Sequence, residues 1–131
     1  MVELTLLVPW CLFMFVFVID MGFYEYSLIS VENATRIAAE YTSQSSSVAA
    51  DATGACTRVL AELSGLPNIG STVTGCAASP LIVTASSVTG TDGNPATSVT
   101  VAYQGLSMIP IPGLMQGRLY FNRTAQMRVS Q

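Results

Sequence analysis

The feature that most constrains this chain is an apolar stretch near its N-terminus, Glu3 to Asp20, which reads ELTLLVPWCLFMFVFVID. Residues 4–19, between the two carboxylates, carry no formal charge. As an α-helix they span about 24 Å at 1.5 Å per residue, slightly less than the hydrocarbon core of a bilayer, about 30 Å. A core helix of a soluble protein is the alternative, but such helices are rarely apolar on every side. We therefore expect a helix embedded in a membrane.

The residues that flank this stretch argue against a secretory signal peptide. Signal peptides begin with basic residues and end in a small-residue cleavage site. Here the first basic residue is Arg36, and the stretch continues into DMGFYEY. Single-span membrane proteins usually carry Lys or Arg on their cytoplasmic side. We expect that a basic segment has been cut away, or that the helix has left the membrane for another apolar setting.

The amino-acid composition argues against several classes of function. Of the 131 residues, 50% are hydrophobic and 10% are charged, against about a quarter charged in an average protein. Arginine is the only basic residue type, so a basic surface for nucleic acid is not expected. Histidine, the commonest acid–base catalyst and metal ligand, is absent. Glu25, Glu32 and Glu40 have the spacing of a solvated helix face. We expect no enzyme, no cofactor and no metal.

The chain has 3 cysteines. Cys11 lies within the apolar stretch and is expected to behave as a small hydrophobic residue. If the rest of the chain is exported, a disulfide between Cys56 and Cys76 is expected, with two unlinked thiols as the alternative. The sequons that begin at Asn33 and Asn122 are weak indications of glycosylation sites, since such short motifs also arise by chance.

After Asp20 the pattern becomes amphipathic. Apolar residues recur mostly at steps of three and four, which predicts one helical stripe: Leu28, Val31, Ala34, Ala38, Tyr41, Val48, Ala52, Val59 and Leu63. No proline interrupts residues 10–66, so the helix is predicted to continue to the stop signal at Gly65-Leu66-Pro67, or to break once near Ser43–Ser47 or at Gly54. A stripe this narrow needs partners for the other faces of the helix.

From Pro67 onward the sequence is rich in Gly, Ser, Thr and Val and predicts short strands. They are expected at Thr72–Cys76, Leu81–Val88, Ser98–Tyr103 and Leu119–Val129. The turns are expected at residues 77–80 and 90–95. The apolar segment Gly105–Gly117 is either a loop folded over the core or an exposed loop that contacts a neighbouring subunit.

The expected fold is α+β: a long hydrophobic helix followed by a small antiparallel sheet packed on its C-terminal half. Residues 1–22 would form the membrane or filament-core helix. Residues 23–66 would be its amphipathic continuation, and residues 67–131 the small β domain.

Three segments resemble the TadE-like pseudopilins, the minor pilins of bacterial tight-adherence pili. The first is VELTLLVP, residues 2–9, followed by the apolar stretch and IDMG, residues 19–22. The second is NATRIAAEY, residues 33–41. The third comprises VTVAY at residues 99–103, a proline-bearing loop and TAQMRV at residues 124–129. The spacing of Glu3, Pro9 and Asp20 also follows the family pattern.

The resemblance implies a precursor that a prepilin peptidase cleaves in the inner membrane. Assembly machinery in that membrane would then extract the helix into an extracellular filament that serves adhesion, made of copies of this chain or of related pilins. Glu3 would pair with the N-terminal amine of a neighbour. The other residues expected to act in assembly are Pro9, Trp10, Phe13, Phe15, Phe17 and Asp20.

One departure from the family concerns the position of Glu3. Cleavage in the family leaves this glutamate fifth, so either two residues precede Met1 or processing differs. The alternative function is a membrane-anchored envelope module or adhesin that stays monomeric. A permanent anchor gains nothing from a carboxylate at its apolar end, and an ionisable group within a membrane is costly enough to indicate a function.

Overall fold

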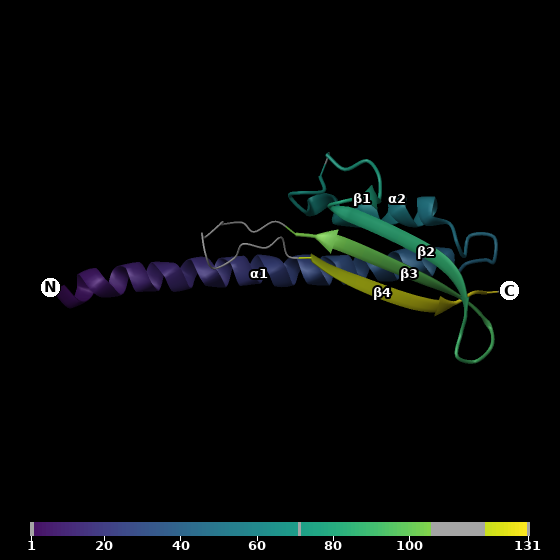
Figure 1. Ribbon diagram of the computed structural model, residues 1–131, viewed down its shortest axis with the longest axis horizontal. Coiled ribbons are helices and arrows are strands. Elements are labelled where there is room, and N and C mark those ends of the chain that lie inside the picture. The colour runs from purple at the N-terminus through teal and green to yellow at the C-terminus, as the bar shows by residue number, and fades with distance from the viewer. Residues whose placement is uncertain (1, 71, 106–119, 131) are drawn as a thin grey trace.

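The computed structural model describes residues 2–70, 72–105 and 120–130, with side chains from Leu4 onward. The predicted α+β fold is confirmed: a long N-terminal helix is followed by a four-stranded antiparallel sheet that packs against it (Figure 1). The elements, in chain order, are α1 (Val2–Thr42), α2 (Ala52–Glu62), the 3₁₀-helix η1 (Leu63–Gly65), β1 (Ala77–Ala78), β2 (Leu81–Thr89), β3 (Pro95–Gln104) and β4 (Tyr120–Arg128).

Helix α1 is a single rod of 41 residues with two different environments along its length. Its C-terminal half lies against the sheet and α2, whereas its N-terminal half extends beyond them (Figure 1). The side chains that α1 buries in the core begin at Val31 and continue through Ala34 and Ala38. Because alanine is small, the sheet and α2 can approach this part of the helix closely.

The helix breaks near Ser43–Ser47, one of the two sites that the sequence allowed. Of the alternatives that the sequence left open, residues 23–66 therefore form the broken helix rather than the continuous one. The run of serines has low helix propensity, and Asp51 starts a new helix by capping it. Helix α2 then packs beside the C-terminal half of α1. Part of the predicted stripe is thus buried between two helices and the sheet: α1 contributes Val31, Ala34 and Ala38, and the second helix and η1 contribute Val59 and Leu63. Leu28, Tyr41 and Val48 are only partly buried, and Ala52 is exposed.

The sheet is a meander with strand order β1-β2-β3-β4, in which every neighbouring pair is antiparallel. The strands predicted from Leu81, Ser98 and Leu119 are confirmed as β2, β3 and β4, with ends shifted by a few residues. The hairpin at residues 90–94 is also confirmed. It is closed by the Gly90 N–H donating to the Asn94 carbonyl at 2.8 Å, and Gly93 adopts a positive φ of 77° that favours glycine.

The predicted strand Thr72–Cys76 is wrong. Its β-branched residues favour a strand, but the preceding chain turns tightly: the backbone N–H groups of Thr72 and Val73 both donate to the Ile69 carbonyl at 3.2 Å. Pairing with β2 begins only at Ala77, within the segment expected to be a turn. The apolar segment predicted as a loop lies, apart from Gly105, outside the described residues.

The core lies between the inner face of the sheet and the two helices. Tyr103, Leu63 and Leu81 are among its largest fully buried side chains. A buried hydrogen bond also joins the two layers: the Thr97 hydroxyl of β3 donates to the Ala49 carbonyl, which follows α1, at 2.8 Å. This bond fixes the connection between the helices against the sheet, since a buried hydroxyl without a partner would destabilise the fold.

The predicted disulfide joins Cys56 of α2 to Cys76, just before β1, with a Cα–Cα distance of 5.7 Å. It closes a loop with a sequence separation of 20 and ties α2 to the edge of the sheet. Cys11, on the apolar half of α1, is free and exposed.

Removing this disulfide is expected to lower the free energy of unfolding of the domain by about 3 kcal/mol, because the bond restricts the unfolded chain. The measurement is thermal unfolding, in detergent, of the variant carrying both Cys56→Ser and Cys76→Ser. Cys11→Ser is the matched control and should leave the melting temperature unchanged. A peptide map with Cys56 and Cys76 free, or with Cys11 linked to either, would contradict the pairing.

Candidate functional site

The N-terminal half of α1 is the largest apolar surface among the described residues. Its aromatic side chains are exposed rather than packed in the domain: Trp10 by 66%, Phe15 by 66% and Phe13 by 49%. They alternate with exposed aliphatic residues on all sides of the helix. Soluble monomers rarely expose a contiguous apolar surface of this extent, so this one indicates contact with lipid or protein.

Other residues that the sequence assigned to assembly fall on the same rod. Phe17 is 41% exposed, and Pro9 lies inside the helix, where it donates no backbone hydrogen bond. Asp20 ends the apolar stretch and is buried, and its Oδ1 atom has no hydrogen-bond partner among the described residues. The side chain of Glu3 lies outside the described residues, so its assigned role stays a prediction.

Helix α1 is long and apolar enough to cross a membrane, a criterion that core helices and signal sequences also meet. Only 6% of its most apolar window is buried, whereas a core helix would be mostly covered. Among the described residues, the domain leaves most of this part of the helix uncovered, which supports anchoring in a membrane.

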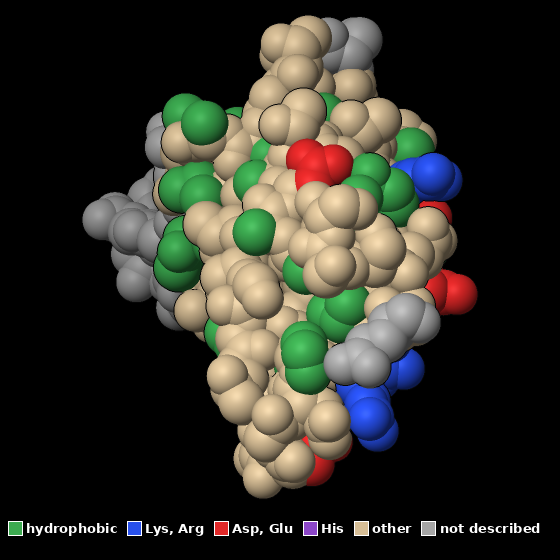
Figure 2. Space-filling view, turned by 90° about the vertical axis from the view of Figure 1, so that its right-hand side faces the viewer, with side chains coloured by type: hydrophobic (Ala, Val, Ile, Leu, Met, Phe, Trp, Pro, Cys, Tyr) green, Lys and Arg blue, Asp and Glu red, His purple; other side chains and the backbone are tan. Residues whose placement is uncertain are grey.

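The surface of the domain differs sharply from the rod. Figure 2 shows its end face, which is mostly backbone and uncharged polar side chains, with hydrophobic side chains interspersed and few charged ones. The outer face of the sheet has the same character, because Thr84, Thr100 and Thr124 lie side by side across β2, β3 and β4. The hydroxyls of Thr100 and Thr124 are hydrogen-bonded at 2.9 Å. Such a surface suits exposure to water.

The acidic residues of α1 do not gather into a catalytic pair. Glu32 forms an exposed ion pair with Arg36 at 2.7 Å, one turn away, whereas Glu25 and Glu40 are exposed. Within the described ranges, the acidic and cysteine side chains form no group of three or more that could hold a metal. The two sequon asparagines, Asn33 on α1 and Asn122 on β4, are exposed. Their modification stays a prediction.

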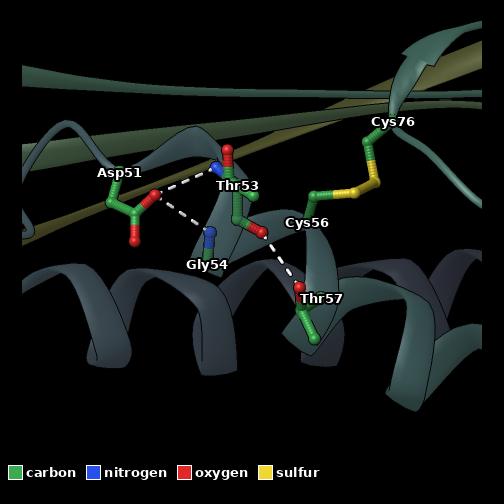
Figure 3. Close-up of a disulfide and its surroundings, with 6 residues drawn as sticks. All are labelled: Asp51, Thr53, Gly54, Cys56, Thr57 and Cys76. Atoms are coloured by element: carbon green, nitrogen blue, oxygen red, sulfur yellow. Dashed lines mark hydrogen bonds between the residues drawn. A yellow bond between two sulfur atoms is a disulfide. The ribbon is translucent and has the colours of Figure 1, made fainter.

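Asp51 is a structural residue that the sequence reasoning missed. Its Oδ1 accepts the backbone N–H groups of Thr53 at 3.1 Å and Gly54 at 3.0 Å, which caps α2 (Figure 3). Its Oδ2 accepts the Tyr41 hydroxyl of α1 at 3.0 Å. A Cβ on Gly54 would lie 2.5 Å from this Oδ2 and 2.5 Å from a ring carbon of Tyr41, so a larger residue would displace this contact. An aspartate directly before an apolar helical pattern was the signal that could have revealed the cap.

These hydrogen bonds lower the pKa of Asp51, the Gly54 N–H contributing most and the Tyr41 hydroxyl next. A lowered carboxyl pKa stabilises the fold above the ordinary pKa of 3.8, and this stabilisation is lost as the pH falls through the lower folded-state pKa. We expect Asp51→Ala to melt a few degrees earlier than the original chain at pH 7 and the gap to narrow below pH about 4.

The measurement is thermal unfolding as a function of pH. Asp51→Asn is the matched control, because an amide oxygen still caps the helix but does not titrate. Its melting temperature should stay near that of the original chain at pH 7 and lack the acid-dependent component. A gap between Asp51→Ala and the original chain that is constant from pH 7 to pH 2 would contradict the role of the carboxylate.

Comparison of the chain with protein-family models, with curated proteins and with solved structures gave no match.

Proposed function

We propose that this chain is a pilin-like structural subunit. The N-terminal half of α1 holds it in the inner membrane before assembly and packs in the core of an extracellular filament afterwards. The observation that carries the proposal is the division of one continuous helix into an uncovered apolar half and a half built into a disulfide-linked domain.

Three properties support this proposal together. The apolar half is left mostly uncovered by the described part of its own domain, so it needs lipid or other helices. It continues into the domain without a described break, so a force on the helix would be transmitted directly to the domain. The disulfide suits an exported protein, since such bonds persist in oxidising compartments. The similarity of residues 2–9, 19–22 and 33–41 to TadE-like pseudopilins favours a tight-adherence pilus and a role in surface attachment.

The partners in this proposal are other copies of the chain or related pilins, a prepilin peptidase and the inner-membrane assembly machinery. The subunit is not an enzyme in this proposal. Its uncharged polar surface would line the outside of the filament, and the apolar rods would bundle inside.

The test is to express the chain together with a tight-adherence secretion system, shear the cells and examine the released fraction. We expect the protein in that fraction, in filaments visible by negative-stain electron microscopy. A monomeric membrane-anchored module would remain in the membrane fraction after shearing. That result would contradict the filament subunit and favour the membrane-anchored module as the function.

A further inference from the structure

The sheet has two open edges among the described residues. Strand β4 is outermost on one side, and its recorded strand pairing is to β3 alone. On the other side, β1 pairs only with Leu81 and Ile82, so the remainder of β2 has no strand beside it in the described part of the chain. Open edges expose unpaired backbone N–H and C=O groups, which readily pair with another strand.

The hydrogen bonds at the strand ends identify the backbone groups that point outward. The N–H of Gln104 donates to the carbonyl of Pro80, directly opposite it, at 2.8 Å. Hydrogen-bonded pairs recur at every second residue of an antiparallel pair, so the backbone N–H and C=O groups of the even-numbered residues of β2 point toward β3. The N–H of Val83 donates away from β3, to the Cys76 carbonyl at 2.9 Å. The groups that point outward from the open part of β2 therefore belong to Ala85, Ser87 and Thr89.

The same reasoning applies to β4. The N–H of Val129 donates to the Pro95 carbonyl at 3.0 Å, so the backbone N–H and C=O groups of the odd-numbered residues of β4 point toward β3. The outward-pointing backbone groups belong to the even-numbered residues, among them Asn122, Thr124 and Gln126. The side chains of these residues are exposed on the outer face of the sheet.

The two open edges also run in the same direction. Strands β2 and β4 are each antiparallel to β3, so they are parallel to each other. Figure 1 shows both running in the direction of α1. A second copy placed beside the first, with its helix parallel, would bring its β2 next to β4 of the first copy. The parallel hydrogen-bond pattern would then let one residue of β4 bond to two residues of β2.

We propose that β4 of one copy pairs, in parallel, with the open part of β2 of a second copy. In this arrangement the backbone of Gln126 or another even-numbered residue of β4 lies between two outward-pointing residues of β2, such as Ala85 and Ser87 of the second copy. The sheet continues from copy to copy with its hydroxyl-rich face on one side. This inference rests on the proposed filament and specifies how neighbouring domains contact each other.

Charge and symmetry favour this pairing over two β4 strands meeting about a two-fold axis. The open part of β2 reads TASSVT and carries no charge, whereas β4 contains Arg123 and Arg128. Two β4 edges would place the Arg123 side chains of both copies on one joined pair of strands, whereas Arg128 already lies 3.9 Å from Asp92. A two-fold contact would also make the helices antiparallel, so that both could not enter the membrane from the same side. Pairing β4 with β2 joins two different surfaces, and such head-to-tail contacts generate open helical filaments when the rotation does not close a ring.

One test removes a single outward N–H. Gln126→Pro eliminates this donor while leaving the bonds between β3 and β4 intact, since proline is tolerated on edge strands when its nitrogen faces solvent. We expect Gln126→Pro to accumulate in the membrane with its disulfide formed and to be lost from the sheared fraction. Gln126→Ala, the matched control, keeps the N–H and should yield filaments at the normal level.

A second test uses engineered disulfides in a Cys11→Ser background. Ser86→Cys is combined in turn with Asn122→Cys, Thr124→Cys or Gln126→Cys, which sample axial shifts in steps of two residues, about 6.6 Å. Adjacent strands lie about 4.8 Å apart, within the range of Cα separations that a disulfide spans. We expect one of the pairs to give oxidised dimers and higher oligomers, whereas each single cysteine gives at most dimers.

The outcomes separate this inference from the proposed function. Filaments without an oligomer ladder in all three pairs, or normal filaments from Gln126→Pro, would overturn the strand pairing and leave the filament in place. Ladders in membranes that release no filaments would support the pairing and overturn the filament. Neither ladders nor filaments would overturn both. If Gln126→Pro fails to fold, the engineered disulfides decide alone.

Discussion

Replacing Phe15 with aspartate is expected to abolish assembly. Phe15 lies in the middle of the apolar half of α1 and exposes 66% of its surface. In lipid or among packed helices, a carboxylate at this position would be buried without a partner, which costs several kcal/mol. We expect no sheared filament and a reduced amount of subunit that resists carbonate extraction from the membrane. The domain should still form its disulfide, because Phe15 lies outside the core.

Two controls make this result specific. Phe15→Leu keeps an apolar side chain and should assemble normally. Thr91→Lys places a charge in the exposed turn between β2 and β3, on the hydrophilic part of the molecule, and should also assemble. The opposite ranking, with filaments from Phe15→Asp and none from Thr91→Lys, would show that the sheet rather than the helix forms the filament core.

The parts of the fold that depend on local pattern were predictable from the sequence. The uncharged run of residues 4–19 and the stripe through Val31, Ala34 and Ala38 predicted α1, and alternation predicted β2, β3 and β4. The cysteines outside the apolar stretch predicted the disulfide. For the helix and the strands a short window of residues determines the outcome, because helix and strand periodicities are local properties.

The parts that depend on tertiary contacts were less predictable. The Thr- and Val-containing segment 72–76 has strand propensity, but the turns made by the preceding residues leave it outside the sheet. The serines near residue 45 permitted a break, but the hydrogen bond from Tyr41 to Asp51 joins residues that become neighbours only when α2 packs beside α1. Propensity alone does not specify such a contact.

The candidate site also has a part that was predictable from the sequence and a part that was not. The uncharged run of residues 4–19 located the apolar surface from the sequence alone. As a helix of about 24 Å, such a run is stable only in a membrane or packed against other apolar groups. The open edges of β2 and β4 require knowledge of strand order and of the direction in which each N–H points, which the sequence does not contain. The contacts proposed between copies could therefore not be predicted from the sequence without the structure.

Glu3 is expected to act in assembly rather than in folding. A carboxylate at the end of the apolar stretch would be dehydrated once helices bundle, and removing its charge from water costs several kcal/mol unless a close cation compensates. The first arginine along the chain is Arg36, about 50 Å away on a straight helix at 1.5 Å per residue. The α-amino group of a neighbouring copy is the cation that we propose for this pair, and the contact would fix the axial shift between subunits.

Glu3→Gln tests this role because it keeps the shape of the side chain and removes the charge. We expect the amount of subunit in the membrane to be unchanged and the sheared filament to disappear. Glu25→Gln is the matched control, since Glu25 is an exposed carboxylate on the same helix outside the apolar stretch and should be dispensable. Filaments at normal yield from Glu3→Gln would show that Glu3 is only an interfacial residue among lipid headgroups. The axial shift between subunits would then have to come from the strand pairing or from the aromatic side chains of α1.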